Sequence, residues 1–121
     1  MVKKIVSFVI VFLLIANCAT AGEIPSEFRQ KNSPYKHPVH FYGSPYCGHC
    51  LHFSRNMQKE GIPFIFHNVK ASDKANEEMW NLVHSVDSGA NSVRFPVLNV
   101  NGKVLVSPEY KELKKELFRL K

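Results

Sequence analysis

Two cysteines separated by only two residues place the strongest constraint on how this chain can fold. They lie in the stretch Tyr46-Cys47-Gly48-His49-Cys50. An apolar run over residues 39–42 precedes this stretch, and a segment with helical periodicity over residues 48–60 follows it. A Cys-x-x-Cys pair between a strand and a helix is the usual setting of a reactive dithiol. The sequence therefore predicts an α/β unit that presents both sulfurs where a helix begins.

The first 21 residues have the composition of an export signal. Lys3 and Lys4 precede an apolar run from Ile5 to Ala16, and Ala19-Thr20-Ala21 has the small-x-small pattern of a signal-peptidase site. The apolar run is shorter than the roughly 20 residues that a membrane-spanning helix needs. We therefore expect residues 1–21 to be cleaved and the mature protein to be exported, either to a periplasm or as a secreted protein.

Two alternatives to cleavage after Ala21 stay open at this point. The apolar run can remain uncleaved as a membrane anchor. Lipidation of Cys18 is the second alternative, because the preceding Leu14-Ile15-Ala16-Asn17 resembles a bacterial lipoprotein site, although Asn17 stands where a small residue is usual. Cleavage is favoured over both because the leader combines a basic start, a short apolar run and a small-residue site.

The mature chain, residues 22–121, has room for one domain and one core. Loss of the leader lysines lowers the formal net charge from +6 to +4. The densest basic group lies near the C-terminus, where acidic residues are interleaved at helical spacing, as on a solvated helix face. Nucleic-acid binding is therefore not expected.

Cleavage of the leader also leaves Cys47 and Cys50 as the remaining cysteines. In an oxidising compartment the two can form a disulfide at rest. A loop closed over so few residues constrains an unfolded chain very little. A purely structural disulfide is therefore a poor explanation for this pair.

The pattern of elements predicts an extension over residues 22–37, with a short helical piece at Ser26–Gln30, followed by a domain over residues 38–121. Within the domain, apolar alternation and helical spacing predict the order βαβαββα. Ser72 is the expected N-cap of the middle helix, and Asn101-Gly102 is a hairpin turn between two apolar runs. The expected segments are strands at 38–42, 62–66, 96–100 and 103–106, with helices at 48–60, after Ser72 and from Ser107-Pro108. The prediction is an α/β fold, a four-stranded mixed sheet with helices on both faces.

Helical spacing also assigns different environments to the two cysteines. Cys50 shares one helical face with Phe53, Ser54 and Met57. We therefore expect the Cys50 sulfur to face the core and the Cys47 sulfur to be accessible at the start of the helix.

These features together resemble the thioredoxin fold, and the glutaredoxin-like short form most closely, over about residues 38–120. The motif Cys47-Gly48-His49-Cys50 resembles the CGHC active-site motif of protein disulfide isomerases. Arg94-Phe95-Pro96 stands where this superfamily places a cis-proline facing the dithiol. The resemblance implies a thiol–disulfide oxidoreductase, acting as oxidase, isomerase or reductase of protein disulfides, with no cofactor.

The resemblance also implies roles for individual residues. Cys47 is the expected nucleophile and Cys50 the resolving cysteine, with the helix N-terminus and a protonated His49 favouring the charged form of Cys47. Pro96 would be cis and would turn the backbone of Phe95 toward an extended substrate. Tyr46, Pro45 and Phe95 would form an apolar rim, although ordinary packing explains Tyr46 and Phe95 equally well.

The expected partners are protein thiols and disulfides, together with an unidentified redox partner. Three departures from the glutaredoxin pattern weaken the expectation that glutathione is also a partner. Ser44 replaces the usual lysine three positions before the first cysteine. Arg94-Phe95 replaces the usual Thr-Val, and Ser107-Pro108 replaces the Gly-Gly pair that holds glutathione.

An alternative function is an exported metal-binding carrier or adaptor module with Cys47 and Cys50 as ligands. His52 with His37 or His40 would complete a Cys2His2 zinc set. The histidine spacing matches no zinc-finger pattern, and Leu51 occupies the position that a c-type haem motif reserves for histidine. We therefore expect no metal site and favour the redox function.

Overall fold

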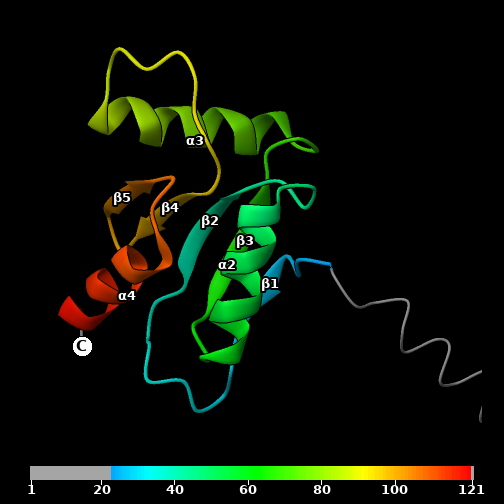
Figure 1. Cartoon of the computed structure of the whole chain (residues 1–121), viewed down its shortest axis with the longest axis vertical. Helices are drawn as coiled ribbons and strands as arrows, with labels where there is room; N and C mark the ends of the chain where they lie inside the picture. The colour runs from blue at the N-terminus through cyan, green and yellow to red at the C-terminus, as the bar shows by residue number, and fades with distance from the viewer. Residues whose placement is uncertain (1–22, 121) are drawn as a thin grey trace, which may run out of the picture.

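The computed structural model describes residues 23–120, so the expected leader and Cys18 lie outside the described residues. The elements along the chain are β1 (Glu27–Phe28), β2 (Val39–Gly43), α2 (Gly48–Lys59), β3 (Phe64–Asn68), α3 (Asp73–Val86), β4 (Val97–Val100), β5 (Lys103–Val106) and α4 (Tyr110–Arg119) (Figure 1). From β2 onward this is the predicted βαβαββα order. Among the helices of the described region, none combines the length and apolar character needed to cross a membrane.

The strands form one mixed sheet in the order β1-β3-β2-β4-β5. The central β2 is parallel to β3 and antiparallel to β4, and β4 pairs with β5 as an antiparallel hairpin. The four predicted strands are therefore present in a mixed sheet. The sheet has a fifth strand, however, because β1 pairs antiparallel with the outer edge of β3.

The helical piece predicted at Ser26–Gln30 is wrong, because this segment contributes β1 instead. The Phe66 amide donates to the Ser26 carbonyl oxygen at 2.8 Å, and the Phe28 ring lies 5.7 Å from the Phe64 ring. A helix of so few residues is unstable by itself. The unpaired edge of β3 offers the same backbone groups long-range partners, and that pairing decides the structure.

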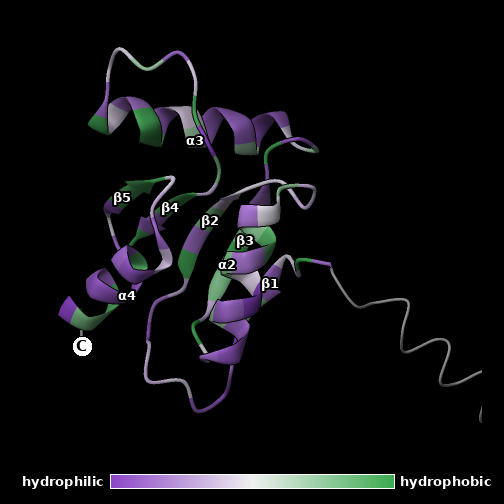
Figure 2. Ribbon diagram, viewed as in Figure 1, coloured by the Kyte–Doolittle hydropathy of each residue, from purple (hydrophilic) through white to green (hydrophobic). Residues whose placement is uncertain are grey.

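Helices cover both faces of the sheet, as predicted, with α2 and α4 on one face and α3 on the other. Hydropathy along α3 alternates between green and purple in Figure 2, as expected of a helix with one buried face. Beneath α2 and α4 the core contains Phe41, Phe64, Leu98, Phe53, Met57, Leu113 and Leu117. Beneath α3 it contains Tyr42, Val97, Ala75, Met79 and Val83.

Local signals set the ends of several elements. The Ser72 hydroxyl accepts a hydrogen bond from the Ala75 amide at 3.1 Å, which confirms the predicted N-cap of α3. Asn101 and Gly102 have φ values of 50° and 96°, as the predicted two-residue turn requires.

The final helix begins later than the predicted Ser107-Pro108 start, at Tyr110 with Glu109 as N-cap. Ser107 has a φ of 46°, outside the helical region, and its amide donates to the Pro96 carbonyl oxygen at 2.8 Å. Ser107 is thus tied to the start of β4, and the chain turns into α4 only afterwards.

Candidate active site

A tight turn between β2 and α2 positions Cys47. The Cys47 amide donates to the Ser44 carbonyl oxygen at 3.2 Å, and the Tyr46 amide donates to the Ser44 hydroxyl at 3.2 Å. Cys47 has extended backbone angles and is the N-cap residue of α2, and its carbonyl accepts from the Leu51 amide at 3.1 Å. The Cys47 side chain therefore lies beside the unpaired amides of the first helical turn, where the helix dipole favours negative charge.

The two sulfurs occupy different environments. Cys50 is 0% exposed on the inward face of α2, which confirms the prediction from helical spacing, whereas Cys47 is partly exposed. Burial raises the pKa of Cys50 to about 12, partly offset by a hydrogen bond from the Ser44 backbone. The neighbouring side chain of Cys47 adds to the increase in this pKa. Both residues are free thiols, so the structure describes the reduced form and the disulfide stays a prediction.

His49 reaches the segment that connects β5 to α4. Its Nε2 lies 3.2 Å from the Pro108 carbonyl oxygen, and its ring centre lies 5.1 Å from that of Phe53. A carbonyl can only accept, so Nε2–H is the donor and Nδ1 is the nitrogen left to take up a further proton. His49 therefore links the dithiol helix to the end of the hairpin.

A shallow groove of about 480 Å³ brings together three of the residues predicted for the site, Cys47, His49 and Phe95. Phe95 lies at this groove, the Phe95–Pro96 peptide bond is cis, and Pro96 is fully buried. The groove is lined by Cys47, His49, Val93, Arg94, Phe95 and Ser107. The Cys47 sulfur thus lies beside the segment that the sequence assigned to substrate contact.

Tyr46 does not join this groove. It is 91% exposed, and together with Pro45 it borders a separate hollow on the side of the N-terminal segment. Ile24 and Phe66 also line that hollow. The apolar rim expected from Tyr46, Pro45 and Phe95 is therefore divided between two hollows rather than continuous.

Three contacts at the site were not anticipated from the sequence. Gly43 lies against Cys50, since a methyl group added to the glycine would be 2.5 Å from the Cys50 sulfur. Pro108 supplies the carbonyl that holds His49. The Lys70 ammonium lies 5.8 Å from the centre of the Phe95 ring, within cation–π range. A loop lysine so far along the chain carries no sequence signal for this position.

The residues considered for a zinc set are not assembled into one. His40 Nδ1 lies 3.0 Å from His67 Nε2, and Asn56 is the side-chain partner of His52. Within residues 23–120, no group of three or more His, Cys, Asp and Glu side chains is arranged to hold a metal ion.

Comparison with known proteins identifies the family. A family model described as Glutaredoxin matches residues 39–105, which is more than half of the 121-residue chain. Searches of curated proteins and of solved structures each gave no match. The matched segment begins with β2 and contains the Cys-x-x-Cys pair, the groove segment at Phe95 and most of the hairpin. The chain therefore belongs to the glutaredoxin family of the thioredoxin-fold superfamily, a family of thiol–disulfide oxidoreductases.

Proposed function

We propose that this protein is an exported thiol–disulfide oxidoreductase of protein substrates, with Cys47 as nucleophile and Cys50 as resolving cysteine. The observation that carries the proposal is the difference between the two sulfurs. Cys47 borders an open groove at the helix N-terminus, whereas Cys50 is completely buried behind it. A substrate disulfide can reach only the first of them.

The mechanism follows from this geometry. The Cys47 thiolate attacks one sulfur of the substrate disulfide, whose S–S bond breaks while a Cys47–substrate bond forms, and the other substrate sulfur leaves as a thiolate. Cys50 then attacks the Cys47 sulfur, and its proton ends on the departing substrate sulfur. Two electrons pass from the protein dithiol to the substrate. Oxidation of a substrate dithiol follows the same steps in reverse.

The raised pKa of Cys50 gives these steps an order. At neutral pH the buried thiol is protonated, so it does not compete with Cys47 for an incoming disulfide. It reacts once the mixed disulfide has brought an electrophilic sulfur next to it. An unidentified partner carrying a dithiol or a disulfide would then restore the starting form.

We propose oxidation or isomerisation as the direction of the reaction. The CGHC motif resembles that of protein disulfide isomerases, whose reduction potential is near −180 mV, compared with about −270 mV for thioredoxin. Equilibration of Cys47 and Cys50 with glutathione buffers measures the potential directly. A value near that of thioredoxin would indicate a reductase instead.

Glutathione itself is a weaker candidate as a partner. The family pattern places a Gly-Gly pair after the last strand, where this chain has Ser107 and Pro108. The Pro108 carbonyl accepts from His49, and the Ser107 amide donates to Pro96. Backbone groups in this segment are therefore already engaged within the protein.

Export is supported by the leader-like composition of residues 1–21. Expression of the full chain in a host with a secretion pathway, followed by mass determination of the processed protein, tests the proposal. Loss of residues 1–21 is expected. A lipidated Cys18 would show the lipoprotein alternative, and an intact N-terminus would contradict processing.

Trapping of substrates tests the function. A Cys50→Ser variant is expected to accumulate disulfide-linked protein adducts on Cys47, because the second attack cannot occur. Cys47→Ser is the matched control and should form no adducts, since Cys50 is buried. Absence of adducts with Cys50→Ser under oxidising conditions would contradict the proposed function.

A further inference from the structure

We propose that Lys70, which lies over the Phe95 ring, and Arg94, which precedes Phe95 in the groove, select substrates that carry a carboxylate next to the reacting cysteine. This inference rests on the proposed function and specifies the substrate class. It assigns to the two residues a role in specificity rather than in the exchange chemistry.

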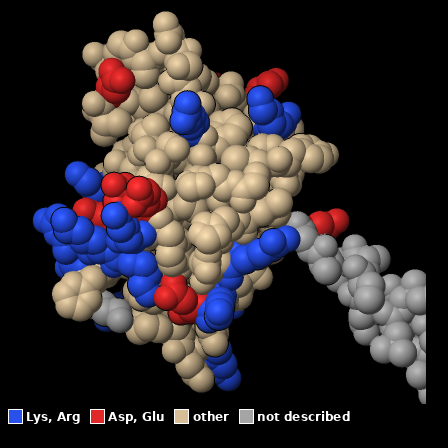
Figure 3. All heavy atoms as spheres, in the orientation of Figure 1, with Lys and Arg blue, Asp and Glu red and all other residues tan. Residues whose placement is uncertain are grey.

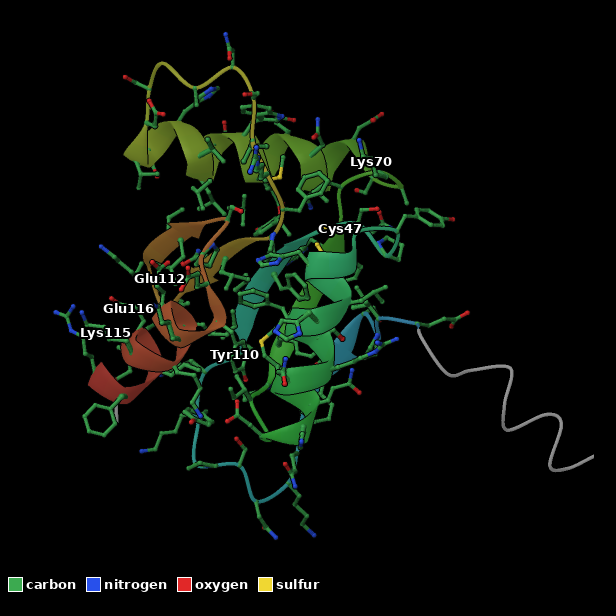
Figure 4. All side chains as sticks on the ribbon, viewed as in Figure 1. Cys47, Lys70, Tyr110, Glu112, Lys115 and Glu116 are labelled. Carbon is green, nitrogen blue, oxygen red and sulfur yellow. The ribbon has the colours of Figure 1, made fainter. Side chains whose placement is uncertain are left out.

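Lys70 is held above Phe95 by the turn that ends β3. The Asn68 side-chain oxygen accepts from the Lys70 amide at 3.0 Å and from the Ala71 amide at 3.2 Å. The buried Val69, which lies between Asn68 and Lys70 in the chain, donates its amide to the Gly43 carbonyl oxygen at 3.0 Å. The turn is thus anchored to the strand that leads into the dithiol, and Figure 4 shows Lys70 on this loop.

Arg94 lies on the approach to β4 and lines the groove itself, together with Cys47 and His49. No acidic side chain is among the residues that line this groove. Over residues 23–120, neither Lys70 nor Arg94 makes an ion pair, although basic residues elsewhere, such as Arg29 and Lys114, do. Their charges are therefore available to a bound molecule.

The surrounding surface makes these two charges distinctive. In Figure 3 the basic side chains over α4 are crowded among acidic ones, whereas the surface over the start of α2 is largely uncharged, with a few basic and acidic groups along its upper border. A substrate segment laid along Phe95 would come close to both Lys70 and Arg94. An extended polypeptide with Asp or Glu beside its cysteine has the complementary charge.

The predicted preference is moderate, because exposed charges are screened by water and salt. Two exposed charge contacts are expected to give roughly a fivefold rate preference. The Debye length falls from about 10 Å at 0.1 M salt to about 3 Å at 1 M. The preference should therefore shrink at high salt.

The test uses peptides with blocked termini and one internal disulfide. Both cysteines of a peptide are followed by Asp in one version, by Asn in a second and by Lys in a third. The reduced protein is mixed with each peptide for a single turnover, and the peptide thiols formed are measured after acid quenching. No external reductant is needed, because the protein dithiol supplies both electrons.

A doubly substituted Lys70→Gln, Arg94→Gln protein isolates the effect. The Asp-to-Lys rate ratio should fall by roughly fivefold relative to the unsubstituted protein. The Asn peptide is the reference in each protein for any change in rate that does not depend on the charge of the substrate. Because the comparison is between proteins, intrinsic reactivity differences of the peptides cancel. Lys103→Gln with Lys115→Gln is the matched control, which removes two exposed charges from the start of β5 and from α4.

The outcomes separate the inference from the proposed function. An unchanged Asp-to-Lys ratio in the Lys70→Gln, Arg94→Gln protein overturns the inference, even if all peptides react. Oxidised glutathione is run in parallel. If the double substitution slows only the reduction of oxidised glutathione, the two charges bind this small disulfide rather than a polypeptide, and the inference is again overturned. Peptide reduction by Cys47→Ser at the unsubstituted rate would instead overturn the proposed function.

Discussion

The Cys50 sulfur packs directly against the backbone of Gly43, leaving no room for a side chain at that position. A methyl group there would lie 2.5 Å from the sulfur. Gly43→Ala should therefore lower the free energy of unfolding of the reduced protein by about 1–3 kcal/mol, the usual effect of overpacking. Urea denaturation measures the change.

Gly48→Ala provides the matched control for this substitution. A methyl group at Gly48, the first residue of α2, meets no atom within 4 Å. Alanine also favours a helix over glycine, so the stability should be unchanged or slightly higher. Equal stability of the Gly43→Ala and Gly48→Ala proteins would show that the approach of Cys50 to Gly43 is not tight.

The different environments of the two thiols predict selective alkylation. At pH 7 the thiolate of Cys50, with a pKa near 12, amounts to roughly one part in 10⁵. Iodoacetamide should therefore modify Cys47 alone in the folded protein and both cysteines in urea. Peptide mapping by mass spectrometry distinguishes them, and equal labelling of the folded protein would contradict the burial of Cys50.

The stability of the protein should fall in mildly acidic solution because of His67. Burial, followed by the charge of His40, lowers the pKa of His67, and Glu78 opposes the shift only in part. Below a pH of about 6.5 the unfolded chain then binds a proton at this position more readily than the folded protein, so the free energy of unfolding decreases.

Substitution of His67 by Gln tests this pH dependence. Denaturation at several pH values between about 7.5 and 5 should show a shallower decline for His67→Gln than for the unsubstituted protein. His37→Gln removes an exposed histidine and should not change how the free energy of unfolding declines as the pH falls. Identical slopes for all three proteins would rule out a role for His67.

Glu60 connects the end of α2 to α4. Tyr110 and Lys114 both donate to its carboxylate, the latter at 2.7 Å, and Lys114 followed by Tyr110 lowers the pKa of Glu60. Figure 4 shows Tyr110 between these helices. Glu60→Gln should lower the free energy of unfolding at pH 7 by about 0.5–1 kcal/mol, in the range of exposed pairs. Differential scanning calorimetry measures the difference.

The Glu60 contribution should be present above the pKa of an unfolded glutamate, near 4.3, and disappear as the pH falls through the lower pKa of the folded protein. The calorimetric difference should therefore vanish in strong acid. Lys111→Gln, which removes a more exposed pair with Glu109, should have no measurable effect at either pH. A difference that persists in strong acid would indicate a steric cause instead.

The N-terminal strand should contribute measurably to stability, although it lies outside the matched glutaredoxin segment. Phe28 is half-buried and packs against Phe64. Phe28→Ala should cost roughly 1–3 kcal/mol, less than a fully buried phenylalanine. Arg29→Ala, next to it and exposed, is the control. Thermal unfolding measures both, and equal midpoints would mean that β1 is only loosely attached.

The order of elements and the burial of Cys50 were predictable because they depend on local pattern. Helical spacing around Cys50, the Asn101-Gly102 turn and the Ser72 cap each act within a few residues. The N-terminal strand was not predictable in this way. Two residues are too few to show a periodic pattern, and β1 forms because it pairs with the edge of β3.

The details around the site were harder to predict for the same reason. Lys70 contacts Phe95 only because loops that are distant in sequence pack together. The same packing places Tyr46 and Phe95 at different hollows. The start of α4 was predicted too early because the bond from Ser107 to Pro96 joins the two ends of the hairpin, and no spacing rule contains it.

The short strand β1 also changes how the sheet meets other molecules. Without it, the backbone groups of β3 would be open along one margin, as those of β5 are along the other. Unpaired strand margins invite pairing with further chains and hence aggregation. With β1 in place, that margin of the described sheet ends in a strand of two residues, and the opposite margin is the four-residue β5, which begins at the exposed Lys103. Both margins are therefore short, which limits edge-to-edge association.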